Sequence, residues 1–288
     1  MSTIDEAIAR VKGVVGVAVK HLETGRGIGI RADETFFTAS TLKVPLLVEL
    51  YRQVDAGRID LSRRVEFTKD LLVSGSGVLR YLGEGLRPTL QDLAMLMTIV
   101  SDNVATDVLY ELVGRERLNE SMLELGLTKT RIPMSTRELL FSIVGLDPNN
   151  PQHTFEEALR RRDEGHVDLE GDAYSEERSD VSAPAEMSRL LEMVYLGEVL
   201  SESSTEAALH ILKSQKLNTV IPYYLPEGTV VAHKTGGVPG VRCDVGIVYG
   251  PTGPYTVALM AKGIEDRTDL DPSLAKVSRA VYDEFESG

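Results

Sequence analysis

The spacing of hydrophobic and polar positions near the N-terminus changes within the first thirty-three residues. Residues 3–12 carry apolar side chains at the spacing of an amphipathic helix. Residues 13–22 and 25–33 then alternate between apolar and polar or glycine positions on either side of a turn at 23–27. This pattern predicts a β-hairpin that follows a short helix.

The middle of the chain has a mainly helical pattern, from Thr41 to about Leu140. Within it, Gly57 is a plausible end of one helix, and Thr89 precedes another as its predicted cap. Residues 141–180 differ, because they begin with a turn-rich break and are then charged throughout. We interpret them as a surface excursion that contains one short helix.

The last third of the chain returns to strands. Two helices are predicted after Pro184, then three strands and a closing helix; the strands are 228–237, 241–250 and 254–263, and the helix is 272–287. The simplest packing joins the strands of both chain ends in one antiparallel sheet, with terminal helices on a face. This arrangement predicts an α/β lobe from 1–37 and about 185–288, and an all-α lobe over about 38–184.

Composition narrows the possible partners and locations. The chain has 288 residues, 42% of them hydrophobic, and a net charge of −13, which argues against binding nucleic acid or an anionic membrane. The single cysteine, Cys243, excludes an intrachain disulfide and suits a reducing compartment. No leader pattern is visible, so we expect a cytoplasmic protein, or a periplasmic or secreted one if a leader was removed. We expect a monomer. We also expect no metal or cofactor, since no zinc-ligand motif is present.

The first candidate for chemistry is the S-x-x-K pair of Ser40 and Lys43. Lys43 stands among apolar residues, where a buried ammonium needs partners. A serine hydroxyl is a weak nucleophile at neutral pH, and a nearby lysine with a lowered pKa can accept its proton. The alternative is a helix cap followed by an incidental lysine, and on this motif alone we favour that alternative.

Two further motifs change that judgement. The second motif is an S-D-N turn between helices, formed by Ser101, Asp102 and Asn103. Ser101 offers a hydroxyl for proton transfer and Asn103 offers an amide for a substrate carbonyl. Asp102 is expected to have a structural role. An ordinary interhelix turn is the alternative. Residues 234–237 form K-T-G-G at the end of a strand. There, Lys234 and Thr235 are candidates to bind a carboxylate, while Gly236 and Gly237 allow a substrate backbone to approach closely; a solvent-exposed strand end is the alternative.

The ordered set S-x-x-K, S-D-N and K-T-G is the signature of class A β-lactamases and penicillin-binding proteins. The chain resembles that family over most of its length, apart from about 141–177. The resemblance implies the α+β two-lobe β-lactamase/transpeptidase-like fold, as a single catalytic domain over 1–288. It implies these roles: Ser40 as the acylated nucleophile, Lys43 as its proton partner, Ser101 as proton donor to the leaving nitrogen, Asn103 on the substrate amide, Lys234 and Thr235 on the carboxylate, and the N–H groups of Ser40 and Gly237 as the oxyanion hole.

By the same resemblance, Glu138 is the candidate for the glutamate that activates the hydrolytic water. Phe141 and Ser142 stand where the family has Leu and Asn, and a helix-start carboxylate is the alternative role for Glu138. Asp180 resembles the aspartate that closes the family's Ω loop, with Arg137 or Arg131 as its predicted partner.

Arg242 is the candidate for a further carboxylate-binding arginine on the next strand. Asp244, two residues on, would repel an anionic substrate unless Arg242 neutralises it.

We therefore expect a serine hydrolase of the class A β-lactamase type that opens β-lactam amide bonds through an acyl-Ser40 intermediate. Its expected partner is a small β-lactam or peptide-like molecule. One alternative is a different enzyme, namely a DD-peptidase, an esterase or an amidase. The other alternative is not an enzyme but a homologue that binds β-lactams or peptides without hydrolysing them.

Overall fold

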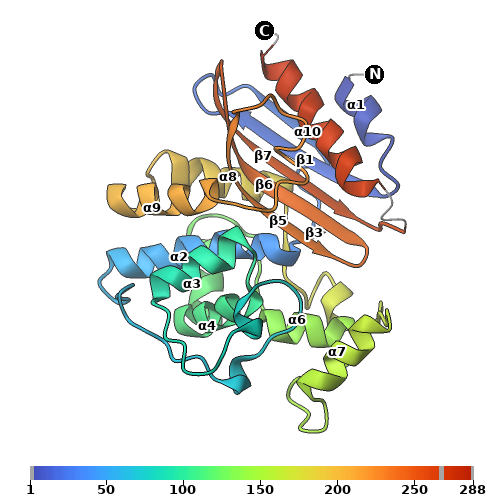
Figure 1. Cartoon of the computed structure of the whole chain (residues 1–288). Helices are drawn as coiled ribbons and strands as arrows, with labels where there is room; N and C mark the ends of the chain where they lie inside the picture. The colour runs from blue at the N-terminus through green and yellow to red at the C-terminus, as the bar shows by residue number, and fades with distance from the viewer. Residues whose placement is uncertain (1–2, 266–268, 287–288) are drawn as a thin grey trace. The chain divides into compact units, whose positions relative to one another are not determined.

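The computed structural model describes residues 3–265 and 269–286, and the chain divides into two compact units (Figure 1). The first unit consists of the residues up to Thr41 and those from Ser182 onward, and the second is Leu42–Val181. Ser287, the last residue of the predicted closing helix, lies outside the described residues.

The first unit is built on one antiparallel sheet with strand order β2-β1-β7-β6-β5. The predicted pairing of the N-terminal hairpin with the C-terminal strands is thus confirmed. Strand β7 is central and buried on both faces, which explains its nearly unbroken apolar sequence. Strand β5, which carries the K-T-G motif, is an edge of this sheet. The strands are β1 Val14–His21, β2 Gly27–Ile30, β5 Val230–Val238, β6 Val241–Gly250 and β7 Gly253–Lys262; the two-residue strands β3 Phe36–Phe37 and β4 Val181–Ser182 complete the set.

Helices cover both faces of this sheet. Helix α10 (Leu270–Glu286) and helix α1 (Thr3–Ile8) lie side by side over one face, where Leu274 and Val277 join a core that includes Val257 of β7. Helix α8 (Pro184–Tyr195) packs against β7 and β1, and helix α9 (Glu202–Lys213) packs against β5. The predicted N-terminal helix over residues 3–12 is too long, because the chain turns after Ile8 so that Val11 enters the core before β1 begins.

The second unit is helical. Helix α2 packs against α3, α4 and α5. Thr89 caps α3 in a reciprocal capping box with Asp92, as predicted, and Gly57 lies just beyond the end of α2 with a left-handed φ of 67°. The helices are α2 Lys43–Asp55, α3 Leu90–Ile99, α4 Asn103–Val113, α5 Arg115–Glu124, α6 Thr136–Ile143 and α7 Phe155–Asp163; short 3-10 helices occupy Ala39–Leu42, Lys69–Leu71, Leu79–Tyr81 and Asp172–Tyr174.

The segment 141–180 contains α7 as its single complete α-helix, as predicted, and a 3-10 turn.

Asp180 accepts a hydrogen bond from Met134 N at 3.0 Å. The pairing of Asp180 with Arg137 or Arg131 stays a prediction. Arg131 donates to the backbone carbonyls of residues 176 and 177, and Arg137 donates to the carbonyl of Asp70, because these carbonyls lie within reach of each guanidinium.

Gly16 lies where β1 passes closest to its neighbours. An added methyl group would lie 2.6 Å from the Phe36 ring and 2.8 Å from Pro184 Cγ. We therefore expect Gly16→Ala to lower the free energy of unfolding by about 1–3 kcal/mol, because an overfilled core must shift. Urea unfolding measures this loss. Gly83→Ala is the matched control, since its added methyl group meets nothing within 4 Å; equal losses in both variants would contradict the packing argument.

Candidate active site

Lys43, the first residue of α2, is almost fully buried and donates three hydrogen bonds. Its Nζ lies 2.9 Å from Ser101 O, from Ser101 Oγ and from Asn103 Oδ1. These three acceptors match the three donors of an ammonium group. The structure thus brings together Lys43, Ser101 and Asn103, three of the residues that the motifs predict, within the second unit.

The S-D-N turn that supplies these acceptors is strained and anchored. Ser101 has a left-handed φ of 56°, which costs a non-glycine residue roughly 1–3 kcal/mol. Its carbonyl is fixed by Lys43 and by the hydroxyl of Ser76 at 2.7 Å. The Asp102 carboxylate accepts from the backbone N–H groups of Val78, Leu79 and Ala105 at 2.6, 2.8 and 3.0 Å, which confirms its predicted structural role.

A loop that the sequence reasoning missed supports this turn. Asn103 Nδ2 donates to the carbonyl of Ser74 at 2.8 Å, and Ser76 Oγ reaches both Ser101 O and Asn103 Oδ1. Gly77 has a φ of 110°, and an added methyl group there would lie 2.4 Å from the Asp102 carboxylate. The run of Ser and Gly at 74–77 was the available signal, because only small residues allow such close packing.

The buried position of Lys43 changes its titration. Burial lowers the pKa of Lys43 to about 7, although the negative charges of Asp102 and Asp107 act in the opposite direction. The amine is therefore partly neutral near neutral pH. Because the unfolded chain holds this proton up to its ordinary pKa, Lys43 makes stability rise as the pH increases from about 7 to its unfolded-state pKa.

In the first unit, the K-T-G strand lies against the backbone at Ser40. An added methyl group on Gly236 would lie 2.8 Å from Thr38 O and 2.9 Å from Ser40 N, so only glycine fits here. Ser40 lies in the 3-10 helix Ala39–Leu42, and Ala39 before it has a strained φ of 43°. Gly236 and the backbone of the predicted nucleophile are thus neighbours.

Lys234 is a buried residue within β5 and donates to the carbonyl of Thr235 at 2.6 Å. Gly237 follows on the same edge strand and has more room than Gly236, because an added methyl group would mainly meet the flexible side chain of Arg242.

Arg242 and Asp244 have different hydrogen-bond partners. Arg242 forms a bidentate ion pair with Asp271 at the start of α10, with both distances 2.6 Å, and also donates to Gly236 O at 3.2 Å. Asp244 is fully buried and bonded to His233 Nδ1 at 2.8 Å. The two carboxylates therefore have separate partners. The sequence reasoning missed His233, whose signal was a polar side chain one position before the K-T-G lysine in an apolar strand.

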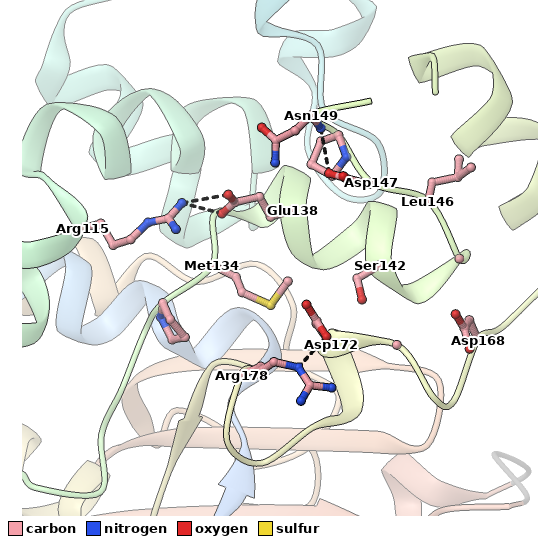
Figure 2. Close-up of a pocket in the computed structure, with 14 residues that line it drawn as sticks. Arg115, Met134, Glu138, Ser142, Leu146, Asp147, Asn149, Asp168, Asp172 and Arg178 are labelled. Atoms are coloured by element: carbon pink, nitrogen blue, oxygen red, sulfur yellow. Dashed lines mark hydrogen bonds and ion pairs between the residues drawn. The ribbon is translucent and has the colours of Figure 1, made fainter. Parts of the chain in front are cut away.

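Glu138 lies at the start of α6 and its carboxylate is bound from two directions. It forms a capping box with Ser135, whose N–H donates to Oε2 at 2.7 Å. Arg115 Nη2 also lies 2.8 and 2.7 Å from its two oxygens, as Figure 2 shows. The pair borders a cavity of about 410 Å³ that Asp172 and Arg178 also line. These contacts agree with the helix-start role that the sequence left open.

Over residues 3–265 and 269–286, no group of three or more His, Cys, Asp or Glu side chains is placed to hold a metal ion. None of the helices described in these ranges is both long and apolar enough to cross a membrane.

The fold and these motifs define a class of serine hydrolases related to penicillin-binding proteins. Residues 1–285 match the model of the beta-lactamase enzyme family, and the chain belongs to that family. It is 27% identical over 267 residues to beta-lactamase ROB-1 of Haemophilus influenzae, covering 91% of this chain and 76% of that protein.

Two solved structures are similar to almost the whole chain. The beta-lactamase of Sphaerobacter thermophilus has a TM-score of 0.80 and 27% identity, covering 99% of this chain and 96% of its own. The structure of PBP-A has a TM-score of 0.81 and 27% identity, covering 99% and 95% respectively. The predicted fold class is confirmed, and the chain is a class A β-lactamase-like serine hydrolase.

The close approach at Gly236 leads to a prediction about Ser40. We expect Gly236→Ala to slow covalent labelling of Ser40 by a penicillin at least about tenfold, because the added methyl group displaces the Ser40 backbone. Gly83→Ala is the control and should change the rate less than about threefold, since its added methyl group meets nothing within 4 Å. The labelling rate is followed by mass spectrometry of the intact protein. Equal rates in the two variants would contradict this reasoning.

Proposed function

We propose that the protein opens the amide bond of β-lactams by acylating Ser40 and then releases the product by hydrolysis. The single observation that most supports this proposal is the buried Lys43, with three hydrogen bonds to Ser101 and Asn103. Membership of the beta-lactamase enzyme family supports the same reaction class.

In the proposed acylation, Ser40 Oγ attacks the β-lactam carbonyl carbon while its proton passes to the neutral amine of Lys43. The bond between that carbon and the ring nitrogen then breaks, and Ser101 delivers its proton to the nitrogen while it takes the proton from the Lys43 ammonium, which becomes a neutral amine again. The lowered pKa of Lys43, about 7, supports its role, because a base with a pKa near the working pH is available and still basic. Water later cleaves the Ser40 ester and yields a ring-opened acid.

The oxyanion of this reaction is proposed to bind the backbone N–H groups of Ser40 and Gly237. The close approach of Gly236 to Ser40 N supports this assignment, because it places the backbone of β5 next to the backbone of the nucleophile within one unit. An edge strand also leaves backbone groups open for a peptide-like substrate to pair with.

Substrate binding is proposed to use Asn103 for the amide side chain and Lys234 and Thr235 for the carboxylate. Gly236 contributes by leaving space for the substrate backbone. Arg242 adds positive charge near this strand end, although its bidentate pairing with Asp271 offsets part of that charge. We therefore assign it a smaller share of carboxylate binding than Lys234.

The test is mass spectrometry of the intact protein after mixing with a penicillin and with a cephalosporin. We expect a mass increase of one whole β-lactam molecule on Ser40, with consumption of the drug beyond one equivalent. Ser40→Ala should abolish the adduct, because no other residue carries the attacking oxygen in the proposal. Absence of both adduct and turnover in folded wild-type protein would overturn the proposed function.

The contacts of Glu138 favour a second candidate, a penicillin-binding peptidase whose β-lactam adduct persists. Both oxygens of Glu138 are engaged by Arg115, and one also accepts the N–H of Ser135. A carboxylate held in this way is poorly placed to activate water. One equivalent of stable adduct without further drug consumption, together with cleavage of a D-Ala-D-Ala peptide, would identify this candidate.

Activation of the hydrolytic water by Glu138 stays a prediction, and one substitution tests it. From its contacts, we expect Glu138→Ala to leave the rate of acyl-Ser40 loss within about threefold. The same change should lower the free energy of unfolding by about 1–2 kcal/mol, because the capping box and ion pair disappear. Adduct lifetime and urea unfolding measure the two effects. A trapped adduct in the variant alone would assign Glu138 to deacylation.

A further inference from the structure

Asp107 is a partly buried carboxylate that the proposed mechanism does not use. It lies on α4, and its two oxygens accept hydrogen bonds from Thr136 N at 2.7 Å and Arg137 N at 2.8 Å. Thr136 and Arg137 are the first two residues of α6. The Asp107 side chain therefore binds the N-terminus of α6, where backbone N–H groups lack partners within the helix.

The same carboxylate lies on the face of α4 that also carries a hydrogen-bond partner of Lys43. Asp107 is one helical turn after Asn103 on α4, so both side chains lie on one face of that helix. Asn103 accepts a hydrogen bond from Lys43, and α2 packs against α4. Burial raises the pKa of Asp107 to about 6, while the Lys43 ammonium and the backbone hydrogen bonds of α6 lower it.

We propose that Asp107 is a positioning residue that couples the docking of α6 on α4 to the protonation of Lys43. When Asp107 is ionised, it holds the first turn of α6 and favours the ammonium form of Lys43. When it is neutral, the N–H groups of Thr136 and Arg137 lose a charged acceptor and Lys43 gives up its proton more readily. The kinetic consequence rests on the proposed function, whereas the effect on Lys43 itself does not.

Other charged groups around this pair do not replace Asp107. The carboxylate of Asp102 also favours the charged form of Lys43, but its hydrogen bonds go to the 78–79 loop and to its own helix. The negative charge of Asp107 also raises the pKa of Asp180 and the pKa of Tyr110. Asp107 binds the start of α6 through both of its carboxylate oxygens.

The central test is the titration of Lys43 in Asp107→Asn. In protein labelled with ¹³C at lysine Cε, the Lys43 resonance is assigned by its loss in Lys43→Arg. We expect the pKa of Lys43 to fall by about one unit in Asp107→Asn, because an opposite charge that favoured the ammonium is gone. Asp107→Glu keeps the charge and should restore most of the difference. An unchanged Lys43 titration in folded Asp107→Asn would overturn the proposal.

The matched control is Glu111→Gln, which removes the same charge one turn further along α4 from an exposed position. It should leave the Lys43 titration in place. If Asp107→Asn does not fold, the wild-type protein supplies the test, because interacting Asp107 and Lys43 must show shared titration steps in their carboxyl and Cε resonances. Independent single-step curves for the two groups would overturn the coupling.

The pH profile of Ser40 acylation separates this inference from the proposed function. We expect the rate to rise with pH in the wild-type protein as Lys43 becomes neutral, and the rise to begin about one pH unit lower in Asp107→Asn. A merely structural role for Asp107 would lower the rate at every pH without moving the profile, and that result would overturn the inference. Wild-type protein that no β-lactam labels would overturn the proposed function, while the Lys43 titration would still decide the role of Asp107.

Discussion

The hydrogen bonding of one buried ammonium group is the constraint on which the S-D-N turn of the second unit depends. Lys43 loses its hydration inside the protein, and this loss is offset by three acceptors at 2.9 Å from the S-D-N turn. To present those acceptors, Ser101 adopts a left-handed conformation that serine disfavours. Asp102 and the 74–79 loop then hold that conformation in place. Removing Lys43 or its acceptors would therefore disturb the whole turn.

A different constraint operates in the first unit, where space and not charge is limiting. Gly236 allows β5 to pass so close to the backbone of residues 38–41 that a single methyl group would collide with three backbone atoms. Helix α9 packs directly against β5, and β6 pairs with it along its length. Residues of the K-T-G strand are thus positioned by packing, and their chemistry depends on a strand that has no freedom to shift.

The segment after Asp107 is where this chain departs from the pattern of the family it resembles. Glu138 is engaged by Arg115 and by its own helix start, and the residues Phe141 and Ser142 stand in place of Leu and Asn. Ser142 instead accepts a hydrogen bond from Ala173 N and so helps to attach the long 141–180 segment. The same helix is held at its start by the Asp107 carboxylate. The start of α6 is therefore held by Arg115, by Asp107 and by its own cap.

The sequence by itself determined the order of the elements, the antiparallel sheet made from both chain ends and the positions of the three motifs. The elements and the motifs follow from local periods, caps and turns, which nearby residues specify, whereas the sheet follows from pairing the strands of both chain ends. Tertiary structure alone decided the partners of the charged side chains. Arg242 pairs with Asp271, Asp244 with His233, Glu138 with Arg115, and Asp107 binds α6. A long charged side chain can reach several acceptors, and which one lies within reach depends on helices and strands that are distant along the chain.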